Sequence, residues 1–175
     1  MRARYLADTS VFARLVKLEV AAAFAPLAAN GHVAVCAPVI FELGYAARSP
    51  SDYRELTDRL LAFPPVPTTD ADHRRAVETQ AALAARSQHR ALSLVDALVA
   101  AVAEGRGLTV LHYDADFELV AEVTGQPHHW VVPRGTADLP GAAQTSPPAV
   151  QIRLPRDDRS DVAAIDHHGP GAAAR

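Results

Sequence analysis

The regular alternation of short apolar segments with longer helical segments constrains the fold of this chain most strongly. Strand-like apolar runs are predicted at 4–7, 32–37, 108–112 and 129–132. Helices are predicted at 10–29, from Pro38 onward, and at 50–62, 70–89, 94–104 and 117–124. Alternation of this kind is typical of an α/β domain with a mostly parallel sheet and helices on both faces.

The composition indicates one folded domain followed by a tail. The chain has 175 residues, 49% of them hydrophobic, which is enough apolar material for a core. Every aromatic residue lies between Tyr5 and Trp130, whereas the sequence from 136 onward is rich in alanine, proline and glycine. We therefore expect a folded domain at 1–135 and a mostly disordered tail at 136–175.

Charge and cysteine content exclude several classes of protein. The formal charge is −3, from 17 basic and 20 acidic residues, so the chain lacks the overall positive charge of many nucleic-acid-binding domains. The single cysteine, Cys36, excludes an internal disulfide and a cysteine-rich zinc site. The N-terminus lacks the apolar core of a signal peptide, and no apolar stretch reaches the length of a membrane span. We expect a cytoplasmic protein without membrane contact.

Two carboxylates occur where the surrounding sequence is apolar. Glu42 is the only charged residue between Val33 and Ala47, and Asp96 lies within an apolar helical stretch. A helix that is apolar on all sides is normally buried, and a lone ionised carboxylate inside it is costly. The sequence therefore predicts that something neutralises both acids.

Three further acids follow predicted strands. Asp8 ends the first strand, and Asp114 and Asp116 follow the strand at 108–112. In a parallel sheet the carboxyl ends of the strands line the crevice where ligands bind. Carboxylates gathered there repel one another unless a cation lies between them, and oxygen ligands favour Mg²⁺ or Mn²⁺.

Simpler roles are open for each acid taken alone. Asp8 and Asp116 could cap the helices that they precede, and Ser93 with Asp96 fits a capping box. Glu42 could form a buried ion pair with an arginine. It is the combination of all these positions that favours a metal site.

Four segments of the chain resemble the blocks of a known family. They are Leu6-Ala7-Asp8-Thr9-Ser10, Pro38-Val39-Ile40-Phe41-Glu42-Leu43, Leu94-Val95-Asp96-Ala97-Leu98 and Asp114-Ala115-Asp116-Phe117. Their order and spacing resemble those of PIN-domain ribonucleases, in particular the VapC toxins of bacterial toxin–antitoxin modules. The resemblance covers about 4–133 and leaves the tail out.

The resemblance implies a three-layer α/β/α sandwich and an endoribonuclease that depends on Mg²⁺ or Mn²⁺. Asp8, Glu42, Asp96 and one or both of Asp114 and Asp116 match the acidic positions of the family. Ser10 matches a hydroxyl position that supports the site. An RNA substrate, an antitoxin protein and a homodimer are the partners that the resemblance implies.

Other residues carry weaker expectations. Arg14 and Arg48 lie nearest the acids in sequence and are candidate RNA contacts. His128 and His129 are adjacent on a strand, so they point apart and are expected at the surface. Two other functions stay open, a PIN-fold RNA-processing nuclease without an antitoxin and a catalytically silent binding module.

Overall fold

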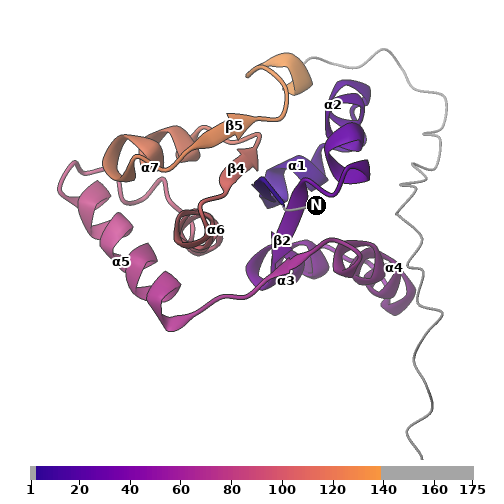
Figure 1. Cartoon of the computed structure of the whole chain (residues 1–175), viewed down its shortest axis with the longest axis horizontal. Coiled ribbons are helices and arrows are strands. Elements are labelled where there is room, and N and C mark those ends of the chain that lie inside the picture. Colours follow the sequence, from indigo (N-terminus) through magenta and orange to yellow (C-terminus); the bar gives the residue numbers. More distant parts are fainter. Residues whose placement is uncertain (1–2, 139–175) are drawn as a thin grey trace, which may run out of the picture.

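The computed structural model describes residues 3–138, which form a sheet of five strands covered by helices (Figure 1). The strands are β1 (Tyr5–Ala7), β2 (Val33–Cys36), β3 (Pro65–Val66), β4 (Thr109–His112) and β5 (His128–Trp130). Their order in the sheet is β3-β2-β1-β4-β5, and every neighbouring pair is parallel. The predicted α/β class and parallel sheet are confirmed.

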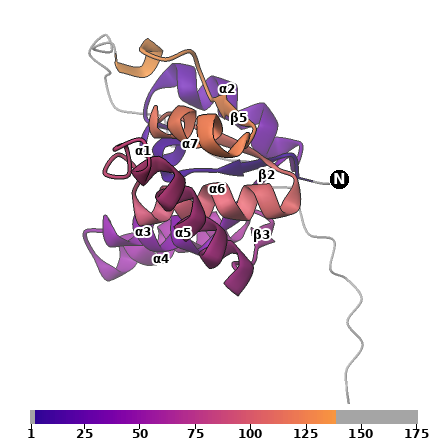
Figure 2. The same cartoon turned by 90° about the vertical axis from the view of Figure 1, so that its left-hand side faces the viewer.

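The helices lie in two layers, one on each face of the sheet (Figure 2). One layer holds α3 (Ala37–Tyr45), α4 (Pro50–Leu61), α5 (Asp70–Ala84), α6 (Leu94–Arg106) and α7 (Asp116–Thr124). The other holds α1 (Thr9–Ala13) and α2 (Leu18–Ala29). Leu6 faces the first layer and Ala7 the second, because successive residues of a strand point to opposite faces of the sheet. The expected α/β/α sandwich is confirmed.

Helix α6 runs through the centre of the first layer. Seven consecutive residues, 97–103, are buried, which confirms the prediction from its apolar sequence. A capping box formed by Ser93 and Asp96 begins the helix, and Gly107 ends it in a left-handed conformation with φ of 63°. Asp96 is therefore fixed in the first turn of a buried helix.

Two predicted helices differ from the structure, and one strand was not predicted. The expected helix at 10–29 is two helices, because the chain turns between Arg14 and Lys17. The expected helix at 70–89 ends at Ala84. The two-residue strand β3 was not predicted, because a proline argues against a strand in sequence analysis. Pro65 is tolerated because β3 lies at the edge of the sheet.

The domain extends slightly beyond the expected boundary at 135. Thr136–Asp138 form a short 3-10 helix, in which Ala137 is buried and its N–H donates to the Tyr113 hydroxyl at 2.9 Å. Residues 139–175 lie outside the described residues, so the tail stays a prediction. Among residues 3–138, no helix has both the length and the apolar content needed to cross a membrane.

The strand order creates a topological switch point beside the central strand β1. The chain moves outward from β1 through β2 to β3 and then returns to the other side of β1 to form β4. The connections leave the carboxyl ends of β1 and β4 in opposite directions, which is the switch point where open α/β sheets bind ligands. Asp8 follows β1 directly, and Asp114 lies two residues after the end of β4.

Candidate active site

Asp8 and Asp114 are brought together by the pairing of β1 with β4. Leu6 pairs with Val110 and Ala7 with Leu111, so both strands end at the same edge of the sheet. The Asp8 N–H extends this pairing by donating to the Leu111 carbonyl at 2.9 Å. Asp114 lies just beyond the end of β4, in the turn that leads to α7.

Asp8 is a buried carboxylate with an incomplete set of partners. Its side chain is 2% exposed, and Oδ2 accepts from the Ser10 N–H at 2.8 Å. Oδ1 is buried and has no hydrogen-bond partner among the described residues. Burial raises the pKa of Asp8 to about 6, although the hydrogen bonds from Ser10 oppose this rise.

Asp96 and Glu42 approach the same place from α6 and α3. Burial raises the pKa of Asp96, and the negative charges of Asp114 and Glu42 raise it further. Glu42 Oε2 accepts from the Thr9 hydroxyl at 2.5 Å, which ties α3 to the residue after Asp8.

Asp114 and Asp116 complete the group. Asp114 Oδ1 accepts from the Asp116 N–H at 3.0 Å, within the turn that begins α7. Burial raises the pKa of Asp116, and the charges of Asp114 and Asp96 add to the rise. Since Asp96 also contributes to the raised pKa of Asp8, all five predicted acids act electrostatically on at least one other member.

Two of these acids cap helices and also interact electrostatically with other acids of the group. Asp8 caps α1 and Asp96 belongs to the capping box of α6, yet the charge of another acid of the group also raises the pKa of each. Asp116 is not a cap, because Ala115 occupies that position. No arginine of residues 3–138 forms an ion pair with any of the five acids.

The surroundings of Glu42 differ from the prediction. We expected a helix buried on all sides, but Glu42 is exposed, and its neighbours Phe41 and Tyr45 are 79% and 90% exposed. Only Val39, Leu43 and Gly44 of α3 are buried. The apolar sequence of α3 was therefore a poor guide to burial, and Glu42 accepts a hydrogen bond from Thr9 instead of forming the alternative arginine ion pair.

The donor set fits a hard divalent cation, although the described residues contain no assembled metal site. Within residues 3–138, no three His, Cys, Asp or Glu side chains are close enough to enclose an ion. The bare Oδ1 of Asp8 and the mutual repulsion of the carboxylates would both be relieved by a cation between them. Carboxylate oxygens are the ligands that Mg²⁺ prefers.

Ser10 connects two parts of the site. Its N–H donates to Asp8, and its Oγ accepts from the Tyr113 N–H at 2.9 Å. Arg14 donates to the Ser10 carbonyl at 3.3 Å, and its guanidinium lies 4.7 Å from the centre of the Tyr113 ring. Arg14 therefore lies beside the site, whereas Arg48 is exposed beyond the end of α3.

Two contributors were missed in the sequence. Thr9 was predicted only as part of a motif, and its bond to Glu42 depends on how α1 meets α3. His112 ends a buried strand two residues before Asp114, which was a usable signal, and its Nδ1 accepts from the Asp114 N–H at 3.1 Å.

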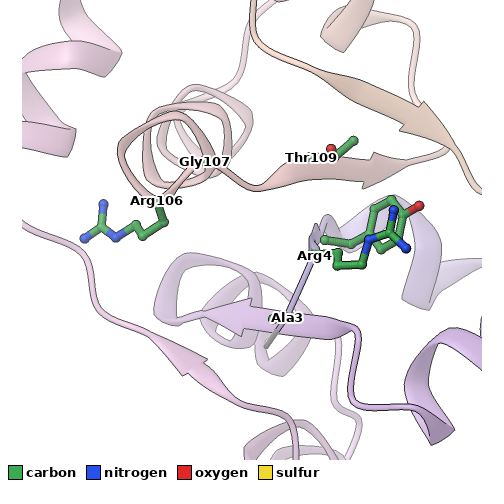
Figure 3. Close-up of a pocket in the computed structure, with 6 residues that line it drawn as sticks. Ala3, Arg4, Arg106, Gly107 and Thr109 are labelled. Atoms are coloured by element: carbon green, nitrogen blue, oxygen red, sulfur yellow. The ribbon is translucent and has the colours of Figure 1, made fainter. Parts of the chain in front are cut away.

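A separate pocket of about 410 Å³ lies at the opposite edge of the sheet (Figure 3). It is lined by Ala3, Arg4, Tyr5, Arg106, Gly107 and Thr109. These residues lie at the amino ends of β1 and β4, so the pocket contains none of the predicted site residues.

Comparison with known proteins points to one family. Residues 5–123 match the PIN domain family. A protein named ribonuclease VapC51, from Mycobacterium tuberculosis, is 49% identical over 138 residues, covering 79% of this chain and 100% of that protein. Ribonuclease VapC21 from the same species is 43% identical over 138 residues, covering 78% of this chain and all of that protein.

Solved structures share the fold at low sequence identity. The VapBC2 complex of Rickettsia felis, bound to a promoter DNA fragment, matches with a TM-score of 0.60 and 16% identity, over 72% of this chain and 98% of the matched chain. The FitAcB structure from Neisseria gonorrhoeae matches with a TM-score of 0.59 and 18% identity, over 73% and 97%. At these identities the likeness shows the fold alone.

Proposed function

The chain belongs to the PIN-domain family and, within it, to the VapC ribonucleases. On this basis we propose that it is a metal-dependent endoribonuclease. We propose further that it acts in the cytoplasm as the toxin of a toxin–antitoxin pair. The observation that carries the proposal is the group of five acids at the switch point of the sheet. They come from four separate segments, and no described arginine neutralises them.

Asp8 and Asp96 are the proposed direct ligands of Mg²⁺ or Mn²⁺. Glu42 and one or both of Asp114 and Asp116 would hold a second ion or orient water. When bound, such an ion holds a phosphate oxygen, lowers the pKa of a bound water and stabilises the leaving oxygen. The buried, bare oxygen of Asp8 supports its role as a ligand.

The other residues of the site position these acids and the RNA. Ser10 fixes Asp8 relative to the turn after β4, and Thr9 fixes Glu42. The guanidinium of Arg14, which lies over Tyr113, is the proposed contact for a phosphate next to the cleaved bond, and Arg48 is a more distant one. The acids can then direct a water at phosphorus in line with the departing 3′ oxygen.

Two matched aspartates test the function. Asp96 and Asp72 each occupy the third position of a capping box, on α6 and α5, but Asp72 pairs with Arg106 outside the site. The purified protein should cleave RNA with Mg²⁺ or Mn²⁺ and stop when EDTA is added. We expect Asp96→Asn to lose more than about 100-fold in rate, because removal of even an outer partner of a metal ligand costs about 10–100-fold. Asp72→Asn should retain cleavage. Cleavage that resists EDTA, or that survives in Asp96→Asn, would contradict the proposal.

The toxin role is tested in cells with the same two variants. Expression of the wild type or of Asp72→Asn should arrest growth, expression of Asp96→Asn should not, and co-expression of the neighbouring open reading frame should relieve the arrest. The fold shared with toxin–antitoxin complexes supports an antitoxin partner. Normal growth with a protein that cleaves RNA in vitro would instead favour an RNA-processing nuclease.

A homodimer is the proposed assembly, supported by exposed apolar side chains. Phe41 and Tyr45 on α3 are 79% and 90% exposed, and Leu94 at the start of the neighbouring α6 is 74% exposed. Large exposed apolar side chains on neighbouring elements are typical of protein interfaces.

In analytical ultracentrifugation, Tyr45→Glu should shift the protein to a monomer. Leu18→Glu, at a 72% exposed position on the other face, should not. A wild-type monomer at high concentration would contradict this expectation.

A further inference from the structure

His112 is a fully buried imidazole whose two nitrogens both have partners. It is 0% exposed at the end of β4. Its Nδ1 accepts from the Asp114 N–H at 3.1 Å, and its Nε2 lies 2.8 Å from His128 Nδ1. His128 was expected at the surface, but it is half-buried and bonded to His112, whereas His129 is exposed as predicted.

The direction of these bonds follows from proton counting. A backbone N–H can only donate, so His112 Nδ1 must be the acceptor and the ring proton lies on Nε2. Nε2–H then donates to His128 Nδ1, and His128 carries its own proton on Nε2. Because Nδ1 accepts a hydrogen bond and only Nε2 carries a proton, the His112 ring is neutral.

Aromatic neighbours hold the His112 ring in this orientation. Its centre lies 5.0 Å from that of Phe117 and 4.9 Å from that of Trp130. With His128 bonded to the far nitrogen, rotation of the ring would break both hydrogen bonds. The acceptor for the Asp114 N–H is therefore fixed in advance.

Side-chain acceptors also hold the neighbouring residues of the turn that carries Asp114. The Tyr113 N–H donates to Ser10 Oγ at 2.9 Å, and the Asp116 N–H donates to Asp114 Oδ1 at 3.0 Å. The Asp114 N–H, which lies between these two in the sequence, donates to His112 Nδ1. The charge of Asp114 in turn acts on Asp96 and Asp116.

We propose that His112 is a positioning residue for the metal site: it holds the Asp114 backbone through Nδ1, and His128 orients its ring for this purpose. The inference rests on the proposed function, since it assigns Asp114 a place beside the cation. In a merely structural role, His112 would only pack in the hydrophobic core. The two roles differ in whether metal binding depends on the hydrogen bond that Nδ1 accepts.

An isosteric pair of variants separates the two roles. His112→Leu and His112→Asn have side chains of nearly the same shape and both lose the bond to His128. Only asparagine keeps an oxygen one bond beyond Cγ, where His112 has Nδ1, and can accept from the Asp114 N–H. His129→Phe is the control, because His129 lies next to His128 on β5 and makes no hydrogen bond to His112.

The measurements are Mn²⁺ binding by calorimetry and exchange of the Asp114 amide hydrogen in the metal-free protein. We expect His112→Leu to weaken Mn²⁺ binding about 10-fold or more and to speed Asp114 exchange, as loss of an outer partner does in other metal sites. His112→Asn should keep both closer to the wild type than the about 10-fold change expected for His112→Leu, and His129→Phe should change neither. The kcat for RNA cleavage should follow Mn²⁺ binding, with KM unchanged.

Equal Mn²⁺ binding and equal Asp114 exchange in the folded Leu and Asn variants would overturn the proposal. Failure of the proposed function is recognised separately, as a wild type that neither binds Mn²⁺ nor cleaves RNA. In that case the exchange comparison alone still decides whether His112 holds the Asp114 amide.

Discussion

Asp8→Asn should abolish RNA cleavage and leave the fold intact. Asparagine can accept the Ser10 N–H as Asp8 Oδ2 does, so α1 keeps its N-terminal cap. It cannot supply the charged oxygen that is bare in the wild type. We expect the cleavage rate to fall more than about 100-fold and Mn²⁺ binding to weaken with it.

Circular dichroism and calorimetry check that this variant is folded, and a cleavage assay with a 3′-labelled RNA measures the loss. Ser10→Ala offers a graded comparison, because it removes only the hydroxyl that accepts from Tyr113 and leaves the Asp8 carboxylate in place. An Asp8→Asn protein that cleaves at the wild-type rate would remove Asp8 from the site.

The same substitution should stabilise the metal-free protein at neutral pH. Burial raises the pKa of Asp8 from its ordinary 3.8 to about 6, so the folded state prefers the protonated acid. A raised carboxyl pKa gives stability that is present below pH 3.8 and is lost as the pH rises through about 6. The difference between these values corresponds to about 3 kcal/mol of unfolding free energy.

Asparagine does not titrate, so the stability of Asp8→Asn relative to the wild type should increase by about 2 kcal/mol between pH 4 and pH 7.5. The difference in unfolding free energy between the variant and the wild type is free of contributions from other titrating groups, because both proteins contain them. One such group is His112, whose lowered pKa destabilises the folded state as the pH falls. Urea unfolding in EDTA at several pH values measures this difference. Saturating Mg²⁺ should shrink the gap at pH 7.5 by stabilising only the wild type. A gap that is constant with pH would show that Asp8 is not destabilised by burial.

The sequence was sufficient to predict those parts of the fold that depend on periodicity. The strands at β1, β2 and β4, the buried helix α6 and the positions of Asp8 and Asp114 after two paired strands all follow from apolar patterning and parallel topology. The break between α1 and α2 was missed, because no glycine or proline marks the turn at Arg14 to Lys17.

Contacts between distant segments could not be predicted in the same way. The bond from Thr9 to Glu42 and the pair formed by His112 and His128 depend on how helices and strands meet in three dimensions. The exposure of Phe41 and Tyr45 was also missed, because apolar composition does not distinguish a core helix from one that offers an interface. The roles of the individual acids stay predictions until the variants are measured.

The placement of β4 beside β1 also determines when during synthesis this protein can become harmful. Asp8 emerges from the ribosome early, but its partners on the neighbouring strand lie about a hundred residues further along the chain, and such distant pairings form late. A nascent or truncated polypeptide that stops before β4 holds only part of the acidic group. Because such a polypeptide lacks Asp114 and Asp116, we expect it to be inactive as a nuclease.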